Sequence, residues 1–143
     1  MISSSAESAA DVDTVWALVA DHRGYASWGP WQQARLEREG TPSPDGVGAV
    51  RILRARPLTM REEVVTFEPP SRLDYVLHSG LPLRDYRASV TLTPSGQGTT
   101  LHWRAEFEPK IPGTGWFYRW FLDRVFDDVT ERAARGAEGR GAP

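Results

Sequence analysis

The hydrophobic period of the chain changes twice, and these changes constrain its fold more than any other feature. Near the start, an apolar stripe has the spacing of an amphipathic helix: Val12, Val15, Trp16 and Val19. From residue 31 to residue 108, apolar and polar residues alternate with a period of two, as in half-buried strands. After Gly113 the period is helical again. The sequence therefore predicts a short helix, a sheet and a long helix, in that order.

Short turns separate the segments that have a period of two. Six such segments are the expected strands: 31–39, 47–56, 59–67, 72–79, 85–93 and 99–108. The links between them are rich in Gly, Pro and Ser. Because parallel pairing needs a long crossover, links this short require antiparallel neighbours. The polar segment 3–8 is compatible with one further strand at an edge of the sheet.

Two short helices are expected before the first long strand. The first falls within residues 11–20, where Ser8 or Asp11 can cap it. The second is a short piece between Gly24 and Pro30, two residues that interrupt regular structure.

A long helix is expected from residue 114 to about residue 135, and only this element is large enough to cover the apolar face of the sheet. The fold class is therefore α+β: a curved antiparallel sheet of six or seven strands around a long C-terminal helix. At 143 residues the chain is expected to form one domain, 1–135. The tail, 136–143, is rich in Gly and Ala and is expected to be flexible.

The composition excludes several classes of function. The absence of cysteine excludes disulfides, thiolate metal sites and a thiol nucleophile, and the three histidines include no pair at helical spacing, so no metal site is expected. The net charge of −2 and the interleaving of acidic and basic residues argue against a nucleic-acid partner. No apolar run approaches the roughly 20 residues of a membrane span, and the start lacks the pattern of a signal peptide. We therefore expect a cytoplasmic protein without membrane insertion.

Six short segments carry a resemblance to a known family through their order and spacing: 15–21 (VWALVAD), 25–28 (YASW), 48–51 (GAVR), 62–64 (EEV), 68–75 (EPPSRLDY) and 98–103 (GTTLHW). Over residues 3–135 the chain resembles the SRPBCC superfamily of START-like helix-grip proteins, and more narrowly its bacterial polyketide cyclase/dehydrase branch. The resemblance implies a deep pocket between the sheet and the C-terminal helix. It implies less about chemistry, because one fold hosts many functions.

Alternation along each strand predicts which side chains face that pocket. The expected inward residues of the last three strands include Tyr75, Leu77, Tyr86, Trp103 and Phe107, with Arg84 at the end of its strand. In segment 47–56, Val50 and Ile52 are expected to point inward, which places Arg54 on the cavity side. His78 and His102 fall on the outer faces, so histidine is not expected to take part in catalysis.

Segment 59–67 has two plausible inner sets, one with Glu62 and the other with Val65 and Phe67. The resemblance favours an inward Glu62, because a carboxylate commonly recurs at that position in the family. A structural role stays open: Glu62 and Arg54 could pair with each other or reach solvent at the pocket mouth, since an unpaired buried charge is costly.

Cyclisation or dehydration of a poly-β-ketone needs proton transfer beside a carbonyl and stabilisation of the enolate oxygen. A carboxylate or tyrosinate can act as the base, and an arginine or a phenol can polarise the carbonyl. The expected catalytic residues are Glu62, Arg54 and Tyr86. The expected ligand-binding residues are Tyr75, Leu77, Arg84, Trp103, Phe107, Tyr118, Phe121, Leu122 and Val125.

Three functions stay open at this point. The favoured one is a cofactor-independent polyketide cyclase or dehydratase of bacterial secondary metabolism that acts on a hydrophobic or aromatic ligand. The second is a non-catalytic carrier or sensor of a lipid or aromatic metabolite. The third is a stress or regulatory protein whose cavity is filled by side chains. A monomer and a homodimer are both compatible with the sequence, because Trp116 and Trp120, off the main helical stripe, either pack under the loops or form a dimer contact.

Overall fold

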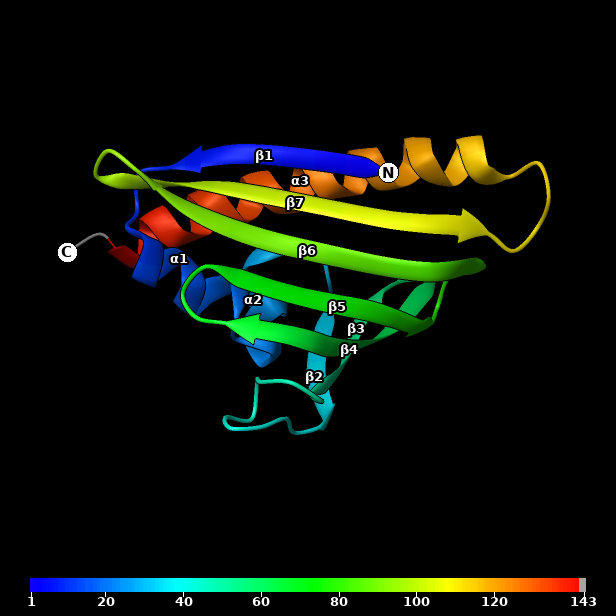
Figure 1. Cartoon of the computed structure of the whole chain (residues 1–143), viewed down its shortest axis with the longest axis horizontal. Coiled ribbons are helices and arrows are strands. Elements are labelled where there is room, and N and C mark those ends of the chain that lie inside the picture. The colour runs from blue at the N-terminus through cyan, green and yellow to red at the C-terminus, as the bar shows by residue number, and fades with distance from the viewer. Residues whose placement is uncertain (142–143) are drawn as a thin grey trace.

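A seven-stranded antiparallel sheet forms one layer of the computed structural model, which describes residues 1–141 (Figure 1). The strands are β1 (Ile2–Ser8), β2 (Gln33–Arg38), β3 (Val50–Ala55), β4 (Leu58–Glu68), β5 (Arg72–Ser79), β6 (Leu83–Ser95) and β7 (Gly98–Pro109). Their order in the sheet is β1-β7-β6-β5-β4-β3-β2. All six strands expected from the alternation are present, and the polar segment near the start is the edge strand β1. The antiparallel meander is confirmed.

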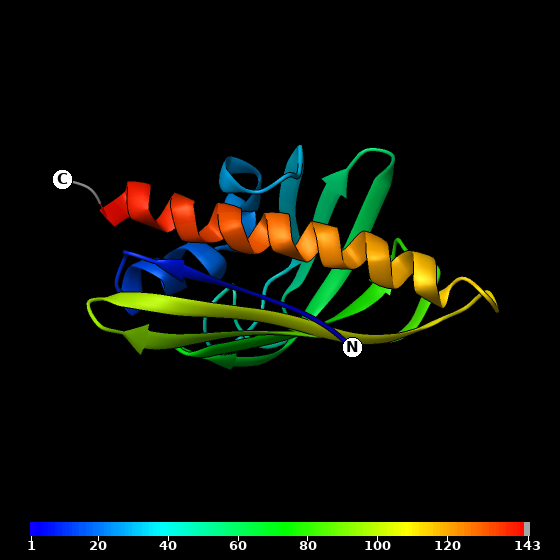
Figure 2. The same ribbon diagram turned by 90° about the horizontal axis from the view of Figure 1, so that it is seen from above.

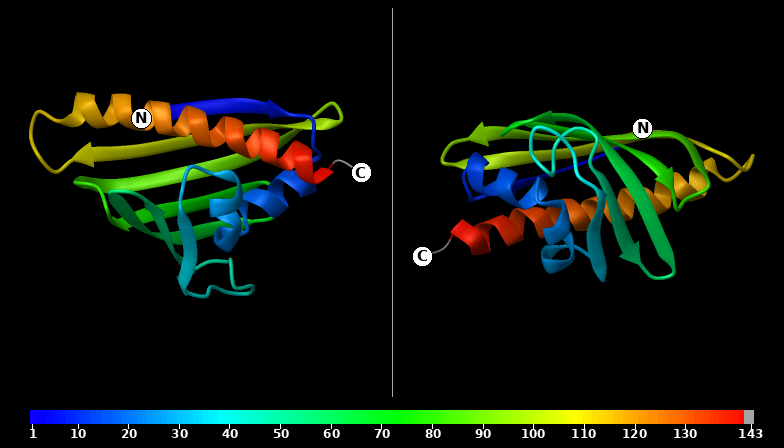
Figure 3. Two further views of the ribbon diagram at one scale, coloured as in Figure 1. Left: turned by 180° about the vertical axis from the view of Figure 1, so that it is seen from behind. Right: turned by 90° about the horizontal axis from the view of Figure 1, so that it is seen from below.

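The helices lie together on one face of this sheet. They are α1 (Val12–Val19), the 3₁₀ turn η1 (His22–Gly24), α2 (Tyr25–Trp28) and α3 (Gly115–Gly141). Asp11 caps α1, since its Oδ1 accepts a hydrogen bond of 2.9 Å from the backbone N–H of Thr14. Helix α3 runs along the sheet beside β1 and β7 (Figure 2), and α1 and α2 lie on the same side (Figure 3). The fold is an α+β helix-grip fold.

Helix α3 continues to Gly141, so the expected flexible tail is wrong for residues 136–141. Ala137 is fully buried. A Cβ on Gly136 would lie 3.3 Å from Leu18 Cδ1 and 3.3 Å from Trp28 Cβ. Small residues therefore let α3 pack closely on α1 and α2, and this contact outweighs the low helix propensity of glycine. Residues 142–143 of the expected tail lie outside the described residues.

The core lies between α3 and the inner face of the sheet. On β5, β6 and β7 the inward residues are the expected ones, and Leu73, Ala88, Val90, Leu101 and Trp103 are all buried. Helix α3 contributes buried Leu122, Phe126 and Val129 to the same cluster. The Trp103 and Phe126 rings meet edge to face, with centroids 6.3 Å apart.

The alternation predicted for β3 is wrong by one residue. Arg51 and Leu53 are buried in the interior, whereas Arg54 is exposed. The ladder pairs Arg51 with Glu62 and Leu53 with Met60, and directly opposed residues share a face. Glu62 is buried, so the inner set of β4 that contains Glu62 is confirmed.

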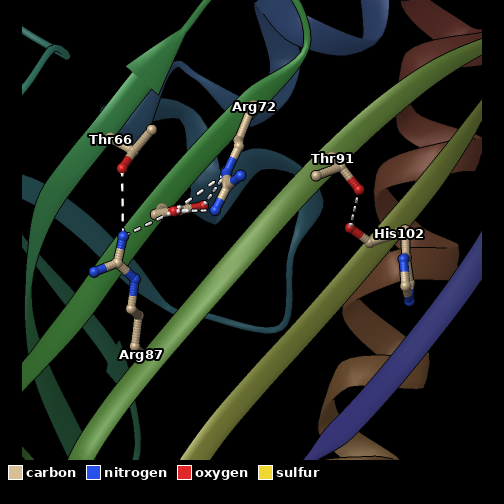
Figure 4. A network of polar contacts seen from close by, with 6 residues as sticks. Thr66, Arg72, Arg87, Thr91 and His102 are labelled. Atoms are coloured by element: carbon tan, nitrogen blue, oxygen red, sulfur yellow. Dashed lines mark hydrogen bonds and ion pairs between the residues drawn. The ribbon is translucent and has the colours of Figure 1, made fainter.

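The outer face of the sheet contains one buried carboxylate, Asp74 on β5. Nη2 of Arg72 lies 2.9 Å from Asp74 Oδ2, and Nη2 of Arg87 lies 3.0 Å from the same oxygen. Arg87 also reaches Thr66, and the Thr91 hydroxyl donates to the backbone carbonyl of His102 (Figure 4). Burial opposes ionisation of Asp74, but hydrogen bonds from Arg72 and its other neighbours outweigh it and lower the pKa to about 2.

Candidate functional site

A buried ion pair joins the two strands that form one wall of the interior. Arg51 on β3 donates through Nε to Glu62 Oε1 on β4, at 3.0 Å. The two side chains are 1% and 5% exposed. Burying a charge costs several kcal/mol unless the charge is well paired. Each side chain of this pair therefore needs the other in order to stay buried.

Two aromatic rings lie against the guanidinium of Arg51. Its Cζ lies 4.5 Å from the ring centroid of Tyr25 and 4.3 Å from that of Tyr75. These cation–π contacts stabilise a desolvated charge. Tyr25 is held in turn, because its hydroxyl donates a 2.6 Å hydrogen bond to the backbone carbonyl of Val19.

His22 completes the surroundings of Arg51. Its Nε2 lies 2.9 Å from the backbone carbonyl of Asp45, and its Nδ1 lies 3.1 Å from Arg51 Nη1. Since the carbonyl can only accept and the guanidinium can only donate, Nε2 carries the proton and Nδ1 accepts. We call Arg51, Glu62, His22, Tyr25 and Tyr75 the Arg51 cluster.

Burial sets the protonation states of the Arg51 cluster. It lowers the pKa of His22 to about 3, and the neighbouring Arg51 charge acts in the same direction. It raises the pKa of Glu62 above its ordinary value, although Arg51 opposes the shift. Burial also raises the pKa of Tyr75, and that of Tyr86 beside it, far above neutrality. The tyrosines are therefore neutral hydrogen-bond donors, which leaves a carboxylate and not a tyrosinate as the possible base.

A small inner cavity of about 30 Å³ lies against Glu62. It is lined by Trp31, Met60, Glu62, Tyr75, Leu77, Leu81, Tyr86, Trp103, Leu122, Val125, Phe126 and Val129. Trp103 Nε1 donates to the Tyr75 hydroxyl at 3.0 Å, which fixes both rings. This cavity has room for about one water molecule and for no organic ligand of ordinary size.

A larger apolar pocket of about 350 Å³ adjoins the inner cavity. The two share five lining residues: Trp31, Met60, Leu81, Leu122 and Val125. The rest of the larger pocket is lined by Pro30, Ala55, Leu58, Trp120, Phe121, Arg124 and Asp128. A third pocket, of about 430 Å³, lies between the turn that joins β3 to β4 and the start of α3, where Phe117 and Tyr118 line it. The three form an apolar path from the Arg51 cluster to the surface.

The structure brings most of the expected ligand-binding residues to this path. Tyr75, Leu77, Trp103, Leu122 and Val125 line the inner cavity, Phe121 lines both outer pockets and Tyr118 lines the outermost. Phe107 is half-buried and stacks on Tyr86, with ring centroids 6.2 Å apart. Arg84 is exposed at the start of β6 and lies outside the linings of these three pockets. Their roles in binding stay predictions.

Of the three expected catalytic residues, Glu62 and Tyr86 lie at the inner cavity and Arg54 does not. Arg51 takes the place expected for Arg54. Residues 50–53 are three apolar side chains and one arginine, so both faces of β3 look apolar and alternation cannot choose between them. The one signal that could have indicated a buried Arg51 was its presence in segment 48–51, one of the segments that carry the family resemblance.

The sequence reasoning also missed His22, because it assigned only His78 and His102 to a face of the sheet. His22 is fully buried, whereas His78 is exposed and hydrogen-bonded to Glu63, and half-buried His102 lies on the outer face. His22 sits in the turn η1 and not in a strand, so no period could indicate its orientation.

Two absences within residues 1–141 bear on other kinds of site. Within this part of the chain, no group of three or more His, Cys, Asp or Glu side chains is placed to hold a metal ion. None of the helices described there has the length and apolar character of a membrane span.

A curved antiparallel sheet around a long C-terminal helix, with an apolar path between them, defines a helix-grip protein of the START-like class. Solved structures of other proteins share this fold. Three of these are protein XoxI from Bacillus cereus (14% identity, 100% of both chains, TM-score 0.80), a START superfamily protein from Mycobacterium smegmatis (18%, 98% of this chain and 95% of that one, 0.74) and a protein from Thermobifida fusca (27%, 94% and 93%, 0.74).

The family model described as polyketide cyclase / dehydrase and lipid transport matches residues 1–138. The chain belongs to this family, within the SRPBCC superfamily. No match to a curated protein was found.

Proposed function

We propose that the protein binds one hydrophobic or aromatic molecule along the path between α3 and strands β3 and β4. The single observation that carries this proposal is the continuity of the inner cavity with the adjoining pocket through five shared side chains. The outer pockets, at about 350 and 430 Å³, fall in the 300–1,000 Å³ range of ordinary ligand sites.

The lining indicates the shape and polarity of the ligand. The outer pockets offer mostly apolar side chains and suit a flat or extended apolar body. The inner cavity ends at the Glu62 carboxylate and the phenols of Tyr75 and Tyr86. A carbonyl or hydroxyl group at one end of the ligand could hydrogen-bond there. Met60 lines both the inner cavity and the adjoining pocket, and its flexible side chain can move aside for such a group.

Cyclase or dehydratase chemistry is a second candidate, favoured by the position of Glu62. Its carboxylate faces the inner cavity, and its raised pKa brings it closer to the range of a general base at neutral pH. In that mechanism Glu62 accepts a proton from the carbon beside a ketone, and the electron pair moves to the carbonyl oxygen as an enolate. The neutral Tyr86 phenol would donate a hydrogen bond to that oxygen. Arg51 keeps Glu62 in place and touches the substrate in no step.

The binding proposal can be tested by blocking the path. Val125 lines both the inner cavity and the adjoining pocket and is half-buried, so Val125→Trp would fill the junction. We expect the affinity for 1-anilinonaphthalene-8-sulfonate or a polycyclic phenol, followed by dye fluorescence, to fall at least tenfold. Val12→Trp, at a half-buried valine on α1, is the matched control and should bind as the unmodified protein does. Equal affinity in both variants would show that the ligand binds elsewhere than along this path.

Catalysis needs a separate assay with a poly-β-ketone substrate. Glu62→Gln and Tyr86→Phe should each slow turnover by roughly a hundredfold if these groups supply acid–base work. His78→Ala, on the outer face, is the control and should keep full activity. Tight binding without turnover of any substrate would assign the protein a carrier function.

A further inference from the structure

Four large apolar residues at one end of the molecule are exposed to solvent. Ile111 in the β7–α3 loop is 54% exposed, and on the first turns of α3 Trp116, Phe117 and Trp120 are 70%, 42% and 51% exposed. We call these four residues the aromatic tip. Their exposure rules out one of the two expectations for Trp116 and Trp120, that they pack under the loops.

The aromatic tip projects from the body of the protein. The start of α3 and the β7–α3 loop extend past the end of the neighbouring strands (Figures 1 and 2). Within the tip the rings support one another: Phe117 lies 6.1 Å from Trp116 and 6.2 Å from Trp120, centroid to centroid. Phe117 also stacks on Phe121, with nearly parallel rings at 6.2 Å. The tip is therefore a structured protrusion of apolar rings.

Basic residues accompany the aromatic tip, although the whole chain has a net charge of −2. Between residues 109 and 122 the charged residues are Lys110 and Arg119, both exposed, and no acidic residue occurs. Cζ of Arg124 lies 4.8 Å above the ring of Trp120. Arg56 is exposed and lines the outermost pocket together with Phe117. Exposed basic residues thus border the rings, and the acidic residues Glu108 and Asp123 lie on either side of this segment.

We propose that the aromatic tip docks onto the surface of a lipid bilayer that contains anionic lipids. Tryptophan is favoured at the membrane–water interface, where an apolar ring is buried and a polar N–H stays hydrated. Lys110 and Arg119 complement the negative surface potential. A second copy of the chain is the other candidate partner, and the oligomeric state of the protein distinguishes it from a bilayer. A projecting group of rings can also enter the interfacial region of a bilayer.

The position of the tip suggests what docking does for the protein, and this part of the inference rests on the proposed function. Phe117 lines the outermost pocket and Trp120 lines the adjoining one, so both pockets open beside the tip. When the tip is docked, this end of the apolar path faces the bilayer. A lipophilic ligand can then pass between bilayer and protein without crossing water.

Vesicle flotation tests the docking directly. We expect the protein to float with vesicles of phosphatidylcholine and phosphatidylserine at low salt and to bind much less to pure phosphatidylcholine. Lys110→Gln and Arg119→Gln should each weaken binding about fivefold, since a basic residue near an anionic surface contributes about 1 kcal/mol. Ile111→Ser combined with Trp116→Ser should weaken it at least tenfold. Arg104→Gln, exposed on the outer face of β7, and Val47→Ser, an exposed valine outside the tip, are the controls and should bind normally.

The results separate docking from the proposed function. Ile111, Trp116, Lys110 and Arg119 lie outside the linings of the three pockets, so these variants should keep their affinity for a soluble dye without vesicles. Loss of dye binding in the Val125→Trp variant with normal flotation would confirm that the two sites are independent. No flotation with anionic vesicles, or equal flotation of all variants, would overturn the docking proposal. A dimer in sedimentation that Trp116→Ser dissociates would also overturn it and identify a second copy as the partner.

Discussion

Acidification should destabilise this protein through His22. The pKa of His22 is about 3 in the folded state, because burial and Arg51 oppose its charged form. In the unfolded chain it returns to about 6.5. Between these values the unfolded state binds a proton that the folded state does not, so the stabilising contribution is complete above about pH 6.5 and is lost as the pH falls towards 3.

The size of the effect follows from the shift. Each pH unit inside this window costs about 1.4 kcal/mol, so lowering the pH from about 6.5 to about 4.5 should remove roughly 3 kcal/mol from the free energy of unfolding. In His22→Gln the neutral amide can still donate to the Asp45 carbonyl and accept from Arg51, and this loss should disappear. His102→Gln, outside the Arg51 cluster, is the matched control.

Urea unfolding followed by circular dichroism, at about pH 7 and about pH 4.5, measures the difference. The unmodified protein and His102→Gln should lose roughly 3 kcal/mol more than His22→Gln over that range. Parallel losses in all three proteins would show that His22 titrates normally, and the account of the Arg51 cluster would then be wrong.

Two further substitutions test the buried charges. Arg51→Leu should lower the free energy of unfolding by about 3–5 kcal/mol, because it leaves the Glu62 carboxylate buried without its partner. Arg51→Leu combined with Glu62→Leu should recover most of that loss, and a double variant no more stable than the single one would contradict this reasoning. Asp74→Asn should cost about 2 kcal/mol at neutral pH, since the pKa of Asp74 is lowered to about 2 and its contribution is present above about pH 4. Thermal or urea unfolding between about pH 2 and 7 should show a shallower acid dependence in Asp74→Asn, and an unchanged dependence would refute the assignment.

The sheet and the helices could be predicted from the sequence because local signals agree with the tertiary structure. Turns rich in Gly and Pro separate strands whose alternation is clear, and on β5, β6 and β7 one face is distinctly apolar. The end of α3 could not be predicted, because Gly136 suggests a break by its own propensity. Gly136 packs against Leu18 and Trp28, which are distant in the sequence, and this tertiary contact stabilises the helix there.

Alternation alone predicted the site only where one face of a strand was distinct, and Glu62 was placed inward through the family resemblance. Tyr75, Tyr86 and Trp103 were placed correctly by alternation. Arg51 was not, because the apolar residues around it occupy both faces of β3, and only its partner Glu62 on another strand explains its burial. His22 lies in a turn, where its orientation depends on contacts with Asp45 and Arg51 that are distant in the sequence.

The central claim is that a ligand occupies the path from the Arg51 cluster to the surface. Methyl-labelled NMR spectra during titration with a polycyclic phenol test it most directly, because four methyl-bearing residues surround the junction of the inner cavity and the adjoining pocket: Met60, Leu81, Leu122 and Val125. Their methyl signals should shift together and saturate, while those of Leu18 and Val19, buried on α1, stay in place. Saturable shifts at Leu18 and Val19 with none at the junction, or no saturable shift anywhere, would contradict the account.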